Sequence, residues 1–237
     1  MHRSPRLFAQ FARWHIWLGW LIGLPVLMWT ATGLVMVARP IEEVRGEHLR
    51  AAASQVDTSL PPGIALPPAL DLTGREVERI EIVAPDGTPV LLATYRDGRV
   101  RRFDPVSGAA LEQLDAAAAE RIALLGLADS RQPVTSRFFA ASDVPFDFRR
   151  PMPVWQVTTQ DGTHVYVGAD TARIEAVRTR WWRVFDGMWG LHIMDLQTRE
   201  DTSHPILIVF AALAALGSLI GCVLLFRRRR ARVTTHG

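Results

Sequence analysis

Residues Pro205–Phe226 read PILIVFAALAALGSLIGCVLLF, a run of 22 residues without a charged side chain. A second uncharged run, Ile16–Ala38, reads IWLGWLIGLPVLMWTATGLVMVA and has 23 residues. About 20 consecutive apolar residues, each rising about 1.5 Å along a helix, cross the hydrocarbon core of a bilayer. Both runs are therefore long enough to span a membrane, and they decide the fold class.

The first run has a rival interpretation as a secretory signal peptide. The apolar part of a signal peptide is short, about 7–15 residues, and ends in a cleavage site with small residues. The run at Ile16–Ala38 is longer, and its last three residues, Met-Val-Ala, lack a small residue at the first position of such a site. The sequence therefore favours a retained transmembrane anchor.

Charge is distributed unevenly along the 237 residues, whose formal net charge is +3. All 24 acidic residues lie between Glu42 and Asp201, and the segment from Arg39 to Asp201 carries a net charge of −5. Arginines flank the two uncharged runs on their outer sides: Arg3, Arg6, Arg13, Arg227, Arg228, Arg229, Arg230 and Arg232. The positive-inside rule predicts both termini in the cytoplasm and the central segment in the periplasm, with the chain in a bacterial inner membrane.

Two other classes of protein are disfavoured by the composition. A nucleic-acid-binding domain is disfavoured because the excess of arginine lies at the chain ends and not within one domain. The run Arg227–Arg230 is typical of a stop-transfer anchor. A disulfide-bonded scaffold is excluded because Cys222 is the only cysteine. Cys222 lies in apolar sequence, which favours a packing role over a reactive one.

The central segment predicts an α+β domain. Val77–Val83 alternates as a strand, and Val90–Tyr95 and Val100–Phe103 follow it across Asp-Gly turns. Apolar residues near helical spacing predict a helix over Leu111–Leu127. Ala51–Leu70 is rich in proline and alanine and predicts an irregular linker.

A repeat relates two parts of this domain. The segment 153–162 matches 89–98 at an offset of 64, with proline, valine, threonine, aspartate and glycine in the same places. The strand predicted at His164–Val167 matches Val100–Phe103 at the same offset. Two strand–turn–strand units on either side of one helix predict a duplicated α+β module.

These residues resemble a known family. The hairpin followed by Asp104-Pro-Val-Ser-Gly108 resembles the PepSY domain, whose usual ending is an Asp-Pro-x-Thr-Gly turn. The stretch Arg13–Gly19 (RWHIWLG), the pair Thr32-Gly33 and the pair Leu191-His192 resemble PepSY-associated transmembrane proteins. In the second unit Gly168-Ala-Asp-Thr-Ala172 replaces the family turn, so that copy departs from the pattern.

The resemblance implies a fold, a cofactor and an activity. Members of the family include siderophore and ferric reductases of the inner membrane, which resemble b-type cytochromes with haem held by histidines in or beside the spans. The fold class expected here is a membrane protein with two transmembrane α-helices flanking an extracytoplasmic PepSY-like α+β domain. Larger members have more helices, so the functional residues transfer only to individual histidines.

The predicted organisation follows the chain in order. It comprises a cytoplasmic N-terminus (1–15), a transmembrane helix (16–38), a linker (39–75), a periplasmic PepSY-like domain with two related units (76–180), an interfacial amphipathic helix (181–196), a second transmembrane helix (205–226) and a basic cytoplasmic tail (227–237).

His15 is the first candidate haem ligand. At 100° per residue it shares a stripe with Gly19, Gly23 and three further residues, Val26, Thr30 and Gly33. Glycine beside a histidine lets a flat macrocycle lie against the helix backbone, and the same Gly-x-x-x-Gly spacing lets two helices approach closely. The alternative role of His15 is an interfacial polar residue in an aromatic belt with Trp14, Trp17 and Trp20.

His192 and His204 are the candidates at the other membrane edge. His192 lies on the aromatic face of the predicted interfacial helix, where a buried imidazole requires a partner such as an iron, a carbonyl or a carboxylate. His204 precedes Pro205 and either caps the second span or binds the outer cofactor. His48 and His164 lie in polar contexts, which predicts surface positions, and His2 and His236 lie at the chain ends.

Geometry predicts how such ligands could combine. His15 is at one membrane edge and the other two at the opposite edge, about 30 Å away, so they cannot share one iron. A relay of two haems then requires His15 to pair with its copy in a homodimer or with another membrane subunit, which would give a four-helix assembly. His192 and His204 could pair within one chain.

Two functions are consistent with these residues. One is haem b-dependent electron transfer across the membrane to a ferric chelate or a periplasmic redox partner. No flavin, nicotinamide, thiol-redox or c-type haem motif is visible, so the donor would be quinol or a separate reductase. The other is a non-enzymatic, membrane-anchored module that binds a periplasmic partner or regulates it.

Overall fold

The computed structural model describes residues 5–51, 72, 76–128 and 132–233. The chain divides into two compact units. Residues 1–39 and 184–237 form the first, called here the membrane unit, and residues 40–183 form the second, called the α+β unit.

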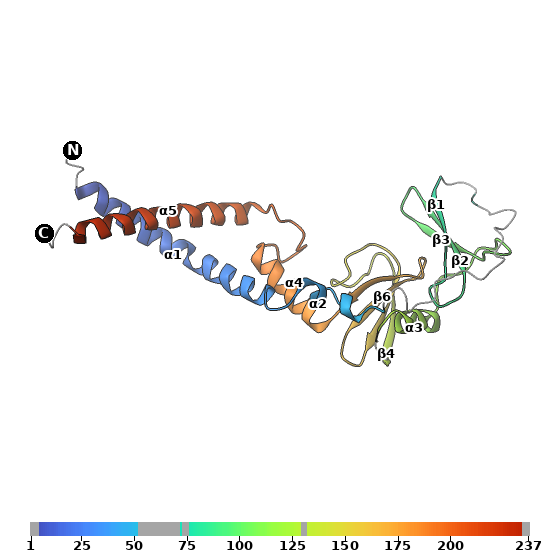
Figure 1. Ribbon diagram of the computed structural model, residues 1–237. Coiled ribbons are helices and arrows are strands. Elements are labelled where there is room, and N and C mark those ends of the chain that lie inside the picture. Colours follow the sequence, from blue (N-terminus) through green and yellow to red (C-terminus); the bar gives the residue numbers. More distant parts are fainter. Residues whose placement is uncertain (1–4, 52–71, 73–75, 129–131, 234–237) are drawn as a thin grey trace. The chain divides into compact units, whose positions relative to one another are not determined.

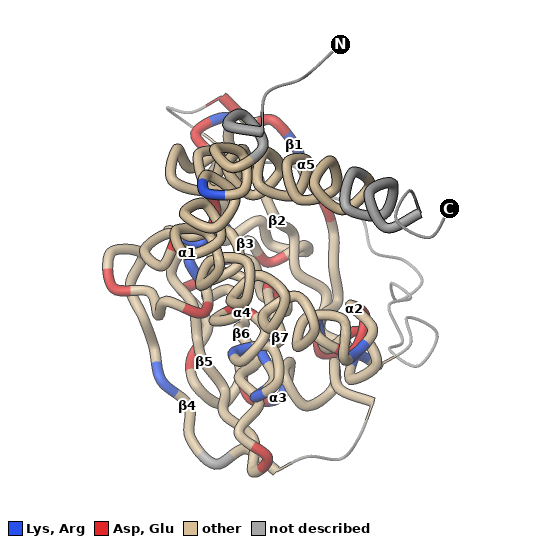
Figure 2. The backbone as a smooth tube through the Cα atoms, turned by 90° about the vertical axis from the view of Figure 1, so that its left-hand side faces the viewer, with Lys and Arg blue, Asp and Glu red and all other residues tan. Residues whose placement is uncertain are grey.

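Two long helices make up most of the membrane unit. Helix α1 spans Pro5–Met36 and helix α5 spans Pro205–Val233, and the two lie side by side in Figure 1. Stretches long and apolar enough to cross a membrane cover Ala9–Met36 and Pro205–Phe226. The backbone tube of Figure 2 is tan over most of both stretches because between them they hold a single charged residue, Arg13. Their apolar side chains are largely exposed, as expected where lipid is the solvent.

Glycines on α5 bring the two helices together. A Cβ atom added to Gly217 would lie 3.0 Å from Ile22 Cδ1 and 3.9 Å from Leu18 Cβ of α1. One added to Gly221 would lie 2.8 Å from His15 Cε1. Gly217 and Gly221 therefore lie at the contact with α1, since only a hydrogen side chain leaves room for these groups.

Helix α4 (Arg180–His192) leads towards α5, and its last nine residues belong to the membrane unit. Its most buried positions there are Asp186 and Gly190, on the side away from His192. Arg199 covers them: it forms an ion pair with Asp186, and its Cγ would lie 2.9 Å from a Cβ on Gly190. The polar side of α4 is thus packed against the loop that precedes α5.

The α+β unit begins with two short helices, α2 (Ile41–Val44) and the 3-10 helix η1 (Glu47–Leu49). Both fall within the predicted linker 39–75, so the part at residues 41–49 is folded. Val44 and Leu49 are buried, which explains why this polar-looking segment is ordered. The proline-rich part of that linker, residues 52–71, lies outside the described residues.

Two antiparallel sheets follow. The first has three strands in the order β1-β2-β3, and the second has four in the order β4-β5-β6-β7, with helix α3 between the sheets in sequence (Figure 1). The bounds are β1 Val77–Val83, β2 Val90–Tyr95, β3 Val100–Phe103, α3 Ala116–Leu125, β4 Pro133–Phe139, β5 Val154–Thr159, β6 His164–Gly168 and β7 Ile174–Arg178. The fold class predicted from the sequence, two apolar helices with a mixed α+β domain, is confirmed.

Helix α3 is shorter than the helix predicted over Leu111–Leu127. Asp115 caps its first turn by accepting a hydrogen bond of 2.7 Å from Ala118 N. The preceding residues are extended, with Leu111 N bonded to Arg102 O and Leu114 N to Ala169 O. Backbone pairing with both sheets therefore competes successfully with helix formation in this stretch.

The duplication predicted from the sequence extends to the backbone of the turns. Strands β2 and β5 begin and end 64 residues apart, as do the turns that follow them. Gly98 has φ +79° and donates to Tyr95 O at 2.9 Å, and Gly162 has φ +76° and donates to Thr159 O at 2.8 Å. Both positions require the left-handed conformation, which glycine adopts without strain.

The second copy of the Asp-Pro-x-Ser-Gly turn keeps its shape despite its different sequence. Gly108 N bonds Asp104 O at 2.9 Å, and Ala172 N bonds Gly168 O at 2.9 Å. Gly108 and Ala172 both have positive φ, +73° and +55°. Gly168 occupies the position that Asp104 has in the first turn. A Cβ atom at Gly168 would lie 2.1 Å from Thr171 Oγ1, so a larger residue does not fit there. The second turn therefore keeps its backbone shape but has no carboxylate at this position.

Candidate functional site

His15 faces helix α5. Its Nδ1 atom lies 3.1 Å from the carbonyl oxygen of Gly217, and the ring packs against the backbone of Gly221. A carbonyl oxygen can only accept a hydrogen bond, so Nδ1 carries the proton and donates it. The neutral ring then has its lone pair on Nε2, the nitrogen that would be free to bind a metal.

His192, the last residue of α4, contacts α1 near the opposite end of that helix. Its Nδ1 atom lies 3.0 Å from Thr32 Oγ1, and Thr32 is 4% exposed. The Thr32 hydroxyl donates its single proton to the carbonyl of Met28 at 2.8 Å, with Trp29 O at 3.2 Å as a second acceptor. The hydroxyl oxygen therefore accepts from Nδ1–H of His192, which leaves the lone pair of that ring on Nε2 as well.

His204 lies directly before α5, and its side chain is the least satisfied of the three. Its Nδ1 atom is buried and has no hydrogen-bond partner among the described residues. A buried nitrogen without a partner costs free energy, so this atom requires a partner that the described residues do not supply, such as a water molecule or a ligand.

The membrane unit has an apolar cavity of about 310 Å³, and some of its lining residues are close to His192 and His204 in the sequence. It is lined by α1, by the end of α4 and the loop after it, and by the first turn of α5: Leu24, Pro25, Met28, Leu191, Met194, Leu196 and Ile206. Its volume is at the lower end of the range for small-molecule pockets, and its walls are apolar with two thioethers.

The two anchored histidines lie far apart. His15 is a residue of α1, and His192 contacts α1 at Thr32, 17 residues further along, which a helix separates by about 26 Å. One iron therefore cannot bind both. In the described part of the chain, no three His, Cys, Asp or Glu side chains are grouped to hold a metal ion.

The glycine stripe predicted beside His15 is divided in the structure. His15 turns towards α5, whereas Gly19 and Gly23 have no heavy atom within 4 Å of an added Cβ and lie on an open face of α1. Trp17 and Trp20 are 70% and 81% exposed, as residues of a lipid-facing aromatic belt would be. The open face formed by Gly19 and Gly23 is therefore not the face of α1 that contacts α5 through His15.

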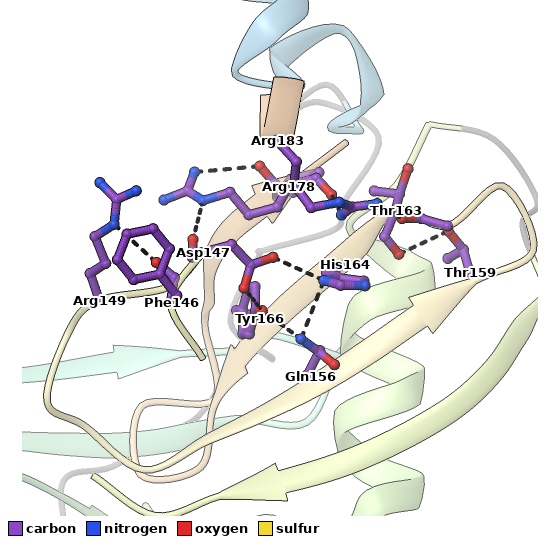
Figure 3. Close-up of polar contacts among 12 residues, drawn as sticks. Phe146, Asp147, Arg149, Gln156, Thr159, Thr163, His164, Tyr166, Arg178 and Arg183 are labelled. Atoms are coloured by element: carbon purple, nitrogen blue, oxygen red, sulfur yellow. Dashed lines mark hydrogen bonds and ion pairs between the residues drawn. The ribbon is translucent and has the colours of Figure 1, made fainter. Parts of the chain in front are cut away.

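A polar cluster in the α+β unit was not predicted from the sequence. Asp147 bonds His164 Nδ1 at 3.0 Å through one carboxylate oxygen and the Tyr166 hydroxyl through the other (Figure 3). Gln156 donates to Tyr166 Oη, and Arg178 Nε donates to Asp147 O at 2.8 Å. The expectation that His164 is a surface residue is wrong, because its side chain is 24% exposed and Asp147 is 14% exposed.

Asp147 has no sequence signal that could have revealed this role. It lies in an irregular loop between β4 and β5, 17 residues from His164. The alternation of β6 does place His164 and Tyr166 on one face of the sheet, so the pair itself could have been noticed. The loop is fixed further by Phe148, which is buried and stacks on Tyr166 at 4.8 Å.

Hydrogen bonds lower the pKa of several carboxyl groups. Burial raises the pKa of Asp147, but the bonds from His164 and Tyr166 outweigh it and hold the pKa below the ordinary 3.8. The pKa of Asp104 is lowered by the backbone N–H and then the hydroxyl of Ser107. Burial, followed by the hydrogen bond to Asp147, raises the pKa of Tyr166 well above its ordinary range.

These shifts predict acid sensitivity. A carboxyl group with a lowered folded-state pKa stabilises the fold above its unfolded pKa, here 3.8, and this stabilisation is lost as the pH falls through the folded value. The urea midpoint of the α+β unit in the full chain should therefore be constant near neutral pH and fall below about pH 4. Asp147→Asn should have a lower midpoint and a flatter profile, and an unchanged profile in that variant would contradict the assignment to Asp147.

The fold and the histidines together define a membrane protein with an attached α+β domain. Comparison with known families gives a match over residues 12–236 to the PepSY-associated TM region. The chain therefore belongs to the PepSY-associated transmembrane family, as the sequence motifs indicated. The search of curated proteins found no match, and neither did the search of solved structures.

Proposed function

We propose that this chain transfers electrons across a bacterial inner membrane by means of haem b and reduces a ferric chelate or a periplasmic redox partner. Haem would supply the one-electron chemistry, while the chain supplies axial ligands, position and an apolar environment. His15 would hold the iron nearer the cytoplasm, and His192 and His204 the iron nearer the periplasm. Both termini are cytoplasmic in this proposal.

The observation that carries the proposal is the orientation of the two anchored imidazoles. His15 and His192 each use Nδ1–H in a hydrogen bond to a fixed oxygen, on Gly217 and Thr32 respectively. Metal-binding histidines commonly have this arrangement, in which the second nitrogen is bonded to the protein and Nε2 is left for the metal. The unpartnered Nδ1 of His204 and the apolar cavity beside Met194 are consistent with a ligand at the second position.

A homodimer is part of the proposal. A haem held by His15 would need a further protein ligand, and a second copy of this chain would provide another His15 and two more helices. The open glycine face of α1 at Gly19 and Gly23 offers a surface for close helix approach. Another membrane subunit with a histidine at the same depth would satisfy the same requirement.

An absorption spectrum of the detergent-purified full chain, expressed with ample haem, tests the proposal. A Soret band that shifts on reduction, with a distinct α-band, is expected at a ratio of two haems per dimer or more. The absence of any haem absorbance would exclude electron transfer by this route. A chemical reductant followed by a ferric chelate then tests whether the bound haem is reoxidised by the acceptor.

Gly221 provides a test of the His15 position that leaves the histidine in place. A methyl group at Gly221 would lie 2.8 Å from His15 Cε1 and 3.3 Å from Nε2, so Gly221→Ala must displace the ring. We expect Gly221→Ala to lose or shift the part of the haem spectrum that depends on His15. The neighbouring Cys222 is exposed, so Cys222→Ala is the matched control and should keep the full spectrum.

The second candidate function is a membrane-anchored binding module without haem. A cavity of about 370 Å³ in the α+β unit favours it. The cavity lies where the end of β1, helix α3 and the second-copy turn meet, and Arg50 and Arg173 line it together with apolar residues. A chain with no haem absorbance but with a retained periplasmic partner would support this function instead.

A further inference from the structure

Three arginines, called here the arginine cluster, lie together where β7 leads into α4: Arg178, Arg180 and Arg183. In the close-up of Figure 3, Arg178 and Arg183 lie above the sheet beside Asp147. Arg178 Nε bonds Asp147 O, and Arg183 bonds the carbonyls of Arg178 at 3.2 Å and Gly162 at 2.8 Å. The side chains are therefore held by backbone carbonyl groups.

No described carboxylate forms an ion pair with any member of the arginine cluster. The carboxylate of Asp147 is used by His164 and Tyr166, and that of Asp161 by Thr159 and Thr163. Carbonyl acceptors orient a guanidinium but do not neutralise its charge. The Asp147 carboxylate interacts electrostatically with Arg178 and Arg183 without forming an ion pair, so one negative charge faces the three positive charges of the cluster.

Two members of the cluster converge on one glycine. A Cβ atom at Gly162 would lie 2.6 Å from Arg180 Nε, and the Gly162 carbonyl accepts from Arg183. Arg180 is exposed, so its guanidinium is accessible beside the anchored Arg183. Two guanidinium groups held next to each other can donate several hydrogen bonds to one phosphate group.

Aromatic side chains accompany the cluster. Arg178 lies 4.2 Å from the ring centroid of Trp182, and Trp181 precedes it in the same helix turn. Tryptophan is enriched at membrane–water interfaces, where its ring meets the boundary between headgroups and acyl chains. Arginine beside tryptophan is therefore the composition of a surface that contacts lipid headgroups.

We propose that Arg180 and Arg183, supported by Arg178, bind the phosphate headgroup of an anionic phospholipid at the membrane surface. Arg180 is the first residue of helix α4, and His192, which contacts α1, is its last. A lipid phosphate would match the excess positive charge of the cluster and the donor geometry of its guanidinium groups. The proposal needs only the membrane family, not haem.

Lipid retention by the purified full chain tests this site. Native mass spectrometry in mild detergent is carried out with phosphatidylglycerol, phosphatidylcholine of the same acyl chains, or inorganic phosphate. The wild-type chain should bind phosphatidylglycerol in preference to phosphatidylcholine. The double variant R180Q/R183Q should bind one fewer phosphatidylglycerol, with about tenfold weaker affinity at that site. The control R99Q/R101Q removes the same charge from exposed arginines of the first module and should bind like the wild type.

A second pair of variants separates geometry from net charge and from misfolding. Gly162→Ala displaces Arg180 without removing charge, and Gly98→Ala introduces the same positive-φ strain where nothing lies within 4 Å. Only Gly162→Ala should lose the bound lipid. Equal lipid binding by the wild type and R180Q/R183Q would overturn the proposal, as would equal losses in both double variants. Displacement of the lipid by millimolar phosphate would identify a soluble-anion site and would also overturn it.

Discussion

Under the proposed haem ligation, His192→Ala is expected to remove the haem absorbance that depends on the α4 end of the bundle and to leave the part that depends on His15. His15→Ala should have the converse effect. The reason is the separation of the two contacts on α1 by about 26 Å, which makes the sites independent. Reduced-minus-oxidised spectra and haem stoichiometry of the detergent-purified variants measure the result.

Thr32→Val sharpens this prediction. Valine keeps the shape of threonine but removes the oxygen that accepts from His192 Nδ1. Loss of such a supporting bond typically weakens a metal site about 10- to 100-fold, so haem should be retained with lower affinity and a shifted reduction potential. His48→Ala, an exposed histidine of the α+β unit, is the control and should be silent. Full haem absorbance in both His15→Ala and His192→Ala would show that the ligand assignment is wrong.

Asp147→Ala is expected to cause the largest loss of stability in the α+β unit. Alanine removes the acceptor of His164 and Tyr166 and leaves both side chains without their partner at a half-buried position. An unsatisfied buried polar group costs about 1–3 kcal/mol, and two lose their acceptor here, so a loss of about 3 kcal/mol is expected. Urea unfolding of the full chain in mild detergent measures it.

Asp143→Ala is the matched control for this prediction because Asp143 is an exposed aspartate of the same loop. It should change the free energy of unfolding by less than about 0.5 kcal/mol. Tyr166→Phe should have an intermediate effect, since it removes one of the two bonds to Asp147 and keeps the ring that stacks on Phe148. Equal midpoints for Asp147→Ala and Asp143→Ala would contradict a structural role for the cluster.

Much of the fold was predictable because its signals are local. The length and hydropathy of an uncharged run such as Pro205–Phe226 can be read directly from its residues. Likewise, an Asp-Gly pair between two alternating segments predicts a tight turn. The strands at Val77–Val83 and Val90–Tyr95 were therefore predicted with their observed bounds. By contrast, β4 and β7 carry weaker alternation, and their pairing is fixed by neighbours elsewhere in the sheet.

The candidate site was predictable only as a set of residue types. The sequence by itself determined two membrane-length helices, a duplicated hairpin module and histidines at the edges of the spans, because hydropathy, turn chemistry and repeats are properties of neighbouring residues. Only the tertiary structure decided which nitrogen of His15 and His192 is bonded, since the partners Gly217 and Thr32 lie 202 and 160 residues away. The hydrogen bonds between Asp147 and His164 and between Arg183 and the Gly162 carbonyl are likewise visible only in the tertiary structure. They depend on atomic positions that are set by packing.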